Sequence, residues 1–284
     1  MIPKIMTNEK NILINAVHLL PKVNDKLMEL LRSLTPADWN NQTVAKLWKV
    51  KDVVAHLLDG NIRVLSMLRD GYYHSKPDLG TNEQLLNYLN ELNADWVKAI
   101  KRVSPNMLIL LHEATGSLYN EYYASLDPSE KSPFSVAWAG EKESLNWMHI
   151  AREYTEKWLH QQQIRDTLND HSLMSKEFFD PLIDIFMLAL PYTYRNVQAA
   201  EGTTIKVTIP GEIGGCWSIS RLENMWRLNK FQHPDPVSEI IIDADTSWRL
   251  FSKSLDAADV KSKVMIKGNR ELGEVALTMV SVMA

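Results

Sequence analysis

Histidine, glutamate and glutamine side chains recur at helical spacing in the segment 146–168. His149, Glu153, Glu156, His160 and Gln163 are separated by four, three, four and three residues, so at about 100° per residue they project as one narrow stripe. If this polar stripe faces a helical core it needs partners, because an unpaired buried carboxylate or imidazole is costly. A divalent metal ion would satisfy several of these groups at once, and Glu156 and His160, one turn apart, can reach the same ion.

Further helices must position this stripe. Apolar residues at helical spacing predict helices at about 8–34, 50–70, 81–100 and 105–126, and His56 lies on the apolar side of the second one. The segment 127–144 is predicted to be a loop anchored by its apolar residues. Helices joined by short connections, with no strand pattern among them, predict an up-and-down bundle.

After residue 169 the pattern of the sequence changes, and from Gly202 onward the hydrophobic period drops to two. One more helix is expected at 178–197, and then alternating residues predict strands at 204–209, 217–222, 225–228, 239–243 and 263–267, with helices at 246–252 and 270–282. We therefore expect a fold that is mainly α plus α+β, with a four-helix bundle at 1–172 and a small α+β domain at 173–284.

Composition narrows the class of protein. The chain has 284 residues, a net charge of −4 and no basic run, which argues against a dedicated nucleic-acid binder. Its single cysteine, Cys216, excludes an internal disulfide and is expected to be structural. No signal-peptide core and no stretch of about 18 apolar residues is present. We expect a cytoplasmic protein, monomeric or homodimeric, that acts on a small molecule without a membrane partner.

Two motifs in the first half resemble a known family. Trp48-x-x-x-Asp52-x-x-x-His56 and Glu156-x-x-x-His160-x-x-Gln163 are similar to motifs of the DinB-like metal-binding four-helix bundles, in the branch of mycothiol-dependent maleylpyruvate isomerase. Members of this family bind a metal through residues at these positions. The resemblance therefore implies that His56, Glu156 and His160 are metal ligands.

The second half resembles the domain that follows the bundle in the same branch, a small α+β domain akin to sterol carrier protein type 2. The matching segments are 214–217, 245–250 and 268–272. The resemblance thus covers most of the chain, in the order and spacing of the two-domain layout.

The proposed ligands also have simpler interpretations. Glu156 and His160 could form a solvated ion pair one turn apart, and His56 could be a hydrogen-bonded core histidine. His149 and Glu153 share the polar stripe and are rival ligands.

The neighbouring polar residues have roles left open as well. Glu153 could instead hold a ligand imidazole from behind, and Gln163 is expected to orient a ligand or a bound water. Asp52 could receive the second N–H of His56 or act as a charge at a helix N-terminus.

Three protein ligands leave a metal ion with open positions, which is typical of a reactive site. Two histidines and a glutamate suit zinc, although nickel, iron and manganese share these ligand types. In the resembled isomerases a thiol cofactor adds to a cis double bond, rotation follows, and the thiol leaves. The resemblance thus implies a metal-dependent isomerase or transferase that uses a low-molecular-weight thiol.

The remaining predicted site residues are those expected to contact the substrate. Trp48, Trp138 and Trp147 are most simply core residues, and Trp138 and Trp147 are also the candidates to line the pocket. We expect Arg270 to hold a substrate carboxylate, with Arg249 and Arg195 as alternatives. Two other functions stay open: a non-enzymatic carrier or sensor with a structural metal, and a metal-dependent hydrolase.

Overall fold

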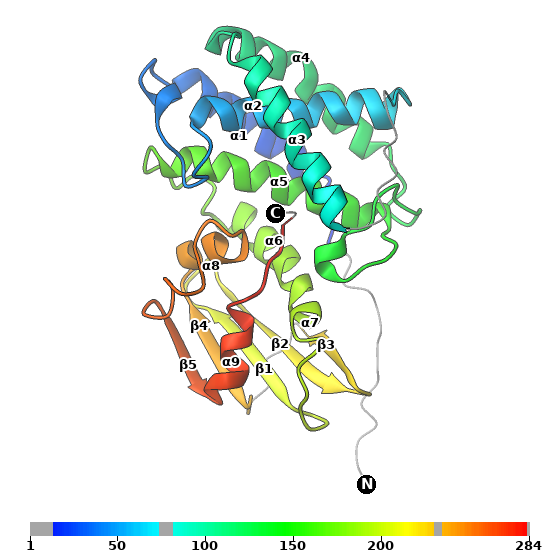
Figure 1. The fold of residues 1–284 in the computed structure, drawn as a ribbon, viewed down its shortest axis with the longest axis vertical. Coiled ribbons are helices and arrows are strands. Elements are labelled where there is room, and N and C mark those ends of the chain that lie inside the picture. Colours follow the sequence, from blue (N-terminus) through cyan, green and yellow to red (C-terminus); the bar gives the residue numbers. More distant parts are fainter. Residues whose placement is uncertain (1–13, 74–81, 230–234, 283–284) are drawn as a thin grey trace.

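The computed structural model describes residues 14–73, 82–229 and 235–282, and it has two layers of different character (Figure 1). Helices form one half of the molecule, and a twisted sheet with short helices forms the other. This is the expected combination of a helical bundle with an α+β region. No helix in the described ranges is long and apolar enough to cross a bilayer.

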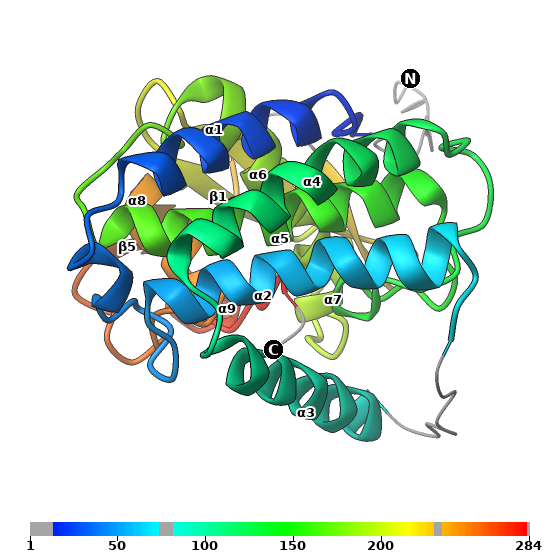
Figure 2. The ribbon, with the colours of Figure 1, turned by 90° about the horizontal axis from the view of Figure 1, so that it is seen from above.

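Four helices enclose the core of the bundle: α1 (Leu19–Ser33), α2 (Val50–Arg63), α4 (Pro105–Ala124) and α5 (Asn146–Asp166). Both α1 and α2 pack against α4 and α5, whereas α3 (Asn82–Ile100) packs outside, against α2 (Figure 2). Successive helices run in opposite directions, and α3 is the return segment that lets α2 and α4 run the same way.

The first helix begins later than the apolar pattern predicted. Residues 1–13 lie outside the described ranges, and α1 begins at Leu19. Pro21 therefore falls in the first turn of the helix, where its missing N–H interrupts no intrahelical hydrogen bond. At its C-terminal end, α2 continues into a π-helical segment, η2 (Val64–Arg69).

The second half begins with a broken helix and continues as a mixed sheet. The helix expected at 178–197 is divided into α6 (Lys176–Phe186), η4 (Met187–Ala189) and α7 (Leu190–Thr193). The strands lie in the order β3-β2-β1-β4-β5, and only the β1–β4 pair is parallel. The bounds are β1 (Thr204–Ile209), β2 (Gly215–Leu222), β3 (Met225–Asn229), β4 (Ser238–Ile242), β5 (Val264–Gly268), α8 (Ala244–Phe251) and α9 (Arg270–Ala276).

One hydrophobic cluster spans both halves, and a second lies within the bundle alone. The Tyr154 hydroxyl of α5 donates to the Phe178 carbonyl of α6 at 2.5 Å, and the rings of Trp158 and Trp248 meet edge to face at 6.1 Å. Arg249 of α8 pairs with Asp166 at the end of α5. The domain boundary at 172/173 falls between α5 and α6 and stays a prediction. Because α6 packs on α5, the back of the helix that carries the polar stripe is held by the second half.

Candidate metal centre

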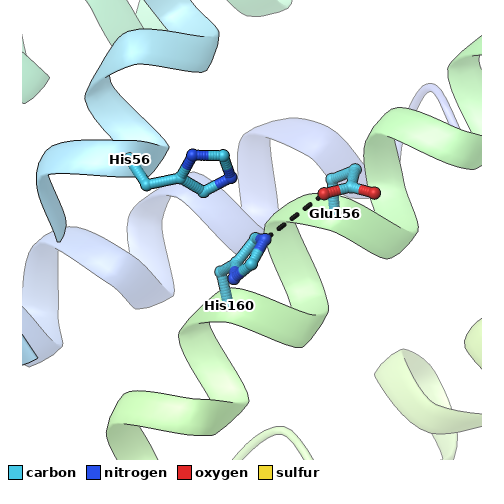
Figure 3. A group of neighbouring side chains, drawn as sticks. All are labelled: His56, Glu156 and His160. Carbon is cyan, nitrogen blue, oxygen red and sulfur yellow. Dashed lines mark ion pairs between the residues drawn. The ribbon is translucent and has the colours of Figure 1, made fainter. Parts of the chain in front are cut away.

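His56 from α2 and Glu156 and His160 from α5 form a cluster, which we call the three-residue group (Figure 3). Each residue offers one ligand atom, and these atoms lie within 4.8 Å of one another. The pairing of α2 with α5 brings His56 opposite the two α5 residues, which share one helix face at i, i+4 spacing. No other set of three such residues in the described ranges could hold a metal ion.

The hydrogen bonds of His160 indicate what lies between it and Glu156. Its Nδ1 lies 3.0 Å from Gln163 Oε1, an acceptor, so Nδ1 carries a proton that it donates. Its Nε2 then presents a lone pair to Glu156 Oε2 at 3.3 Å. A lone pair and a carboxylate oxygen repel each other at this distance unless a proton or a metal ion lies between them. The geometry therefore fits a bound cation, and the hydrogen bond to Gln163 holds the His160 ring in this orientation.

The surroundings of His56 favour the neutral form of its imidazole. Burial, the neighbouring His160 and the charges of Arg63 and Lys157 together lower the pKa of His56 well below its usual value. A neutral imidazole has the free lone pair that metal binding requires. The Nδ1 of His56 is buried and has no hydrogen-bond partner among the described residues. The donor set of two imidazoles and one carboxylate is one that zinc accepts.

Trp48 covers both histidines. Its ring centroid lies 4.7 Å from that of His56 and 6.0 Å from that of His160, and the two imidazoles are 4.5 Å apart. The sequence placed Trp48 in the core, and its position eight residues before His56 gave no sign of contact with His160. The ring restricts access of water to one side of the three-residue group.

His149 and Glu153 belong to a different network, although they share the polar stripe. Arg152 Nη2 donates to His149 Nδ1 at 3.0 Å and to Glu153 Oε1 at 2.9 Å. Glu153 also accepts from the Tyr119 hydroxyl at 2.8 Å, and His149 Nε2 lies 3.1 Å from the Tyr123 hydroxyl. Arg152 thus occupies Nδ1 of His149 and one oxygen of Glu153, and neither residue is grouped with His56.

This network shifts the pKa values of its members. Burial raises the pKa of Glu153, but the Arg152 charge, His149 and the Tyr119 hydrogen bond outweigh burial and hold it at about 2. Burial and the Arg152 charge lower the pKa of His149 to about 4, against the opposing effect of Glu153. At neutral pH, His149 is therefore neutral, whereas Glu153 and Arg152 are ionised.

Lys157 is a buried cation next to the three-residue group, and the sequence did not single it out. Its ammonium donates to the Leu57 carbonyl at 3.2 Å and to the Asn61 side chain, and it lies 4.4 Å from the Tyr119 ring centroid. Burial lowers its pKa to about 8, while Glu153 and Glu156 oppose the shift.

Asp52 has the second of its two expected roles. Its carboxylate accepts the backbone N–H of Lys49 at 3.1 Å in a capping box at the start of α2. Because Nδ1 of His56 has no partner, Asp52 does not receive that N–H.

The predicted substrate residues lie apart from the three-residue group. Trp147 is nine residues before Glu156, roughly 13 Å along α5 at 1.5 Å per residue. Both Trp138 and Trp147 are buried in the large core. Arg270, at the start of α9, is largely exposed and pairs with Glu274 at 2.9 Å. These assignments stay predictions.

The alternatives to Arg270 also have partners elsewhere. Arg249 pairs with Asp166 and Asp245, and Arg195 stacks on Tyr192 with 3.9 Å between its guanidinium carbon and the ring centroid. Neither guanidinium contacts the three-residue group.

Comparison with solved structures shows the same fold. Mycothiol-dependent maleylpyruvate isomerase superposes with a TM-score of 0.53 at 10% identity, covering 88% of this chain and 91% of that chain. A histidine-to-alanine mutant of mycothiol-dependent maleylpyruvate isomerase gives a TM-score of 0.53 at 9% identity with the same coverage. No curated protein matches the sequence. Residues 20–165 match the family model of the mycothiol maleylpyruvate isomerase N-terminal domain, and the chain therefore belongs to this family.

Proposed function

We propose that this chain is a metal-dependent isomerase or transferase that uses a low-molecular-weight thiol, with its metal held by His56, Glu156 and His160. The observation that supports the proposal is the approach of three ligand atoms within 4.8 Å from two helices, with a lone pair of His160 directed at a carboxylate oxygen. A divalent ion at this position would bind a thiolate, lower the pKa of the thiol and act as a Lewis acid.

The exposure of the ligands indicates where a thiol enters. The Glu156 side chain is 31% exposed, whereas that of His160 is 13% exposed and lies under Trp48. Three protein ligands leave room for a fourth, as in catalytic zinc sites. A thiol would therefore approach the group from the side of Glu156, which is more exposed than His160.

The chain's own residues would hold the geometry during turnover. Gln163 keeps the Nδ1 proton of His160 engaged and so directs Nε2 toward Glu156. Trp48 packs on both imidazoles and keeps them from rotating. Lys157 provides a positive charge beside Glu156, which favours the deprotonated form of a thiol that binds there.

The first experiment measures metal content. Protein purified without an affinity metal should contain about one divalent ion per chain by elemental analysis, and His160→Ala should lose most of it because two of three ligands bind weakly. His171→Ala is the matched control, since His171 is an exposed histidine outside the group. Full metal content in the triple variant His56→Ala, Glu156→Ala, His160→Ala would refute the assignment.

The second experiment tests the thiol. Cobalt-substituted protein titrated with cysteine, glutathione, bacillithiol or mycothiol should develop a sulfur-to-metal charge-transfer band, because a soft thiolate is a good ligand for zinc-like ions. Affinity should rise with pH up to the pKa of the free thiol, about 8.5 for a cysteine-like group. If metal is bound and no thiol produces a band, the thiol-dependent function is wrong. A hydrolase that activates water, or a carrier with a structural metal, would then explain the same ligands.

A further inference from the structure

Gly60 lies in the last turn of α2, is half-buried, and has no described atom packed where its side chain would be. A Cβ at Gly60 would meet no described atom within 4 Å. Two other helical glycines differ, because a Cβ at Gly116 would lie 2.6 Å from Asn24 and one at Gly273 would lie 2.6 Å from Ile266. Glycine inside a helix costs roughly 1 kcal/mol relative to alanine. Packing explains that cost at Gly116 and Gly273 but not at Gly60.

Helical register places Gly60 on the side of α2 that carries His56, a member of the three-residue group. Gly60 follows His56 by one turn, so the two positions lie on the same face of α2. On α5, Arg152 precedes Glu156 by one turn. The helices α2 and α5 are neighbours that run in opposite directions (Figure 2). One turn after His56 on α2 and one turn before Glu156 on α5 therefore lie toward the same end of the three-residue group. Gly60 and Arg152 therefore lie toward the same end.

Two guanidinium groups at this end have unused N–H donors. Arg63, three residues after Gly60, uses Nε for Asp59 at 3.0 Å and Nη2 for Asn93 at 3.2 Å. Arg152 uses Nη2 alone, for His149 and Glu153. Nη1 of Arg63, and Nε and Nη1 of Arg152, make no hydrogen bond to a described residue.

Both guanidinium charges act on the three-residue group. The charge of Arg63 contributes to the lowered pKa of His56. Burial lowers the pKa of Arg152, but Glu153 and, to a smaller extent, Glu156 raise it overall. These electrostatic interactions agree with the helical geometry in placing Arg63 near His56 and Arg152 near Glu156.

The balance of charge leaves room for an anion. By residue type, the side chains on these turns that carry formal charge are three basic and three acidic ones: Arg63, Arg152, Lys157, Asp59, Glu153 and Glu156. They cancel, and a divalent metal would add two positive charges. A bound thiolate neutralises one of the two, and a single carboxylate neutralises the other.

We propose that the space beside Gly60 is an anion subsite in which Arg63 and Arg152 hold a carboxylate of a small ligand, next to the open metal position. The proposal rests on the proposed function of the three-residue group. The carboxylate belongs either to the thiol or to the electrophilic substrate, and guanidinium groups suit it because they bind carboxylates through paired N–H donors.

The first arm of the test compares two thiols on cobalt-substituted protein. 3-Mercaptopropionate and 2-mercaptoethanol are similar in size and differ in the carboxylate. After correction for the thiolate fraction, the charge-transfer titration should show binding of the carboxylate thiol about tenfold tighter or more, as a charged hydrogen bond predicts. Arg63→Gln should remove this preference, which is measured within the variant as the ratio of the two thiol affinities per bound cobalt ion and so does not depend on the metal content of the variant.

The second arm tests a carboxylate without sulfur. If the carboxylate belongs to the substrate, calorimetry should show maleate binding to zinc-loaded protein saturated with 2-mercaptoethanol, and the thiol preference of the first arm should be absent. Gly60→Leu fills the space with a good helix former, so it should fold, keep its metal and lose carboxylate binding in whichever arm shows it. Gly60→Ala is the matched control for helix propensity.

The outcomes separate this proposal from the function on which it rests. If the wild-type protein binds no metal ion or no thiol, this result contradicts the proposed function. Metal and 2-mercaptoethanol binding with no carboxylate preference in either arm would overturn the subsite alone. Retained carboxylate binding in Gly60→Leu, in a folded protein with full metal content, would also overturn it.

Discussion

Acid should destabilise this protein through His112, a histidine that takes no part in the three-residue group. His112 is fully buried in α4, its Nε2 lies 3.0 Å from the Val54 carbonyl, and its Nδ1 has no partner among the described residues. Burial and the Lys157 charge lower its pKa to about 4, while the bond to Val54 opposes the shift. A neutral ring that donates from Nε2 to Val54 satisfies this arrangement, whereas a protonated ring does not.

The sign of the pH effect follows from proton linkage. Between pH 6.5 and 4 the unfolded chain binds a proton at His112 and the folded chain does not, so the free energy of unfolding falls as the pH falls through this window. With an unfolded pKa of about 6.5, this single group should cost about 2 kcal/mol between pH 7 and pH 5. His149, whose folded pKa is also about 4, adds a similar amount.

The variant His112→Gln isolates the contribution of His112. Glutamine keeps an N–H that can donate to the Val54 carbonyl and removes the titrating ring. Urea unfolding at pH 7 and pH 5 should show that the variant loses about 2 kcal/mol less than the wild type over this interval. His171→Gln, at an exposed histidine, should behave as the wild type does. An equal loss in His112→Gln and in the wild type would refute the reasoning.

Three further predictions concern the two polar networks and the helix cap. Gln163→Leu should weaken metal affinity about 10- to 100-fold in chelator competition, because His160 loses the acceptor of its Nδ1 proton; unchanged affinity would contradict this role. Arg152→Met should destabilise by about 3–5 kcal/mol in urea unfolding, because the largely buried Glu153 loses its counter-charge and keeps only the Tyr119 hydrogen bond, and adding Glu153→Leu should restore much of the loss. Asp52→Ala should lower stability by about 1 kcal/mol while metal content stays full; a loss of metal would show that the carboxylate acts on the site.

Local sequence was sufficient for much of the fold. The pair Glu156 and His160 could be recognised because i, i+4 spacing on a helix places two side chains on one face whatever surrounds it. The change to a period of two after residue 200 predicted the strands for the same reason, since side chains of a strand alternate between its faces. Pro21 marks the opposite case. A proline inside a helix predicted over 8–34 would kink or divide it. Because α1 begins at Leu19, the proline lies in the first turn instead.

The partners of each side chain depended on tertiary structure. His149 and Glu153 have the same spacing as the proposed ligands, yet α4 presents Tyr119 and Tyr123 to them and Arg152 connects them. Spacing defines a face of one helix, but which group lies opposite that face depends on how distant helices pack.

The same physical reason applies to the site as a whole. The sequence places His56 on the apolar side of α2, but only the antiparallel packing of α2 on α5 brings it within reach of Glu156. The contact of Trp48 with both imidazoles and the space beside Gly60 also arise between helices. Residue types and local period determined which groups could do chemistry. The packing of helices remote in sequence decided which of those groups meet.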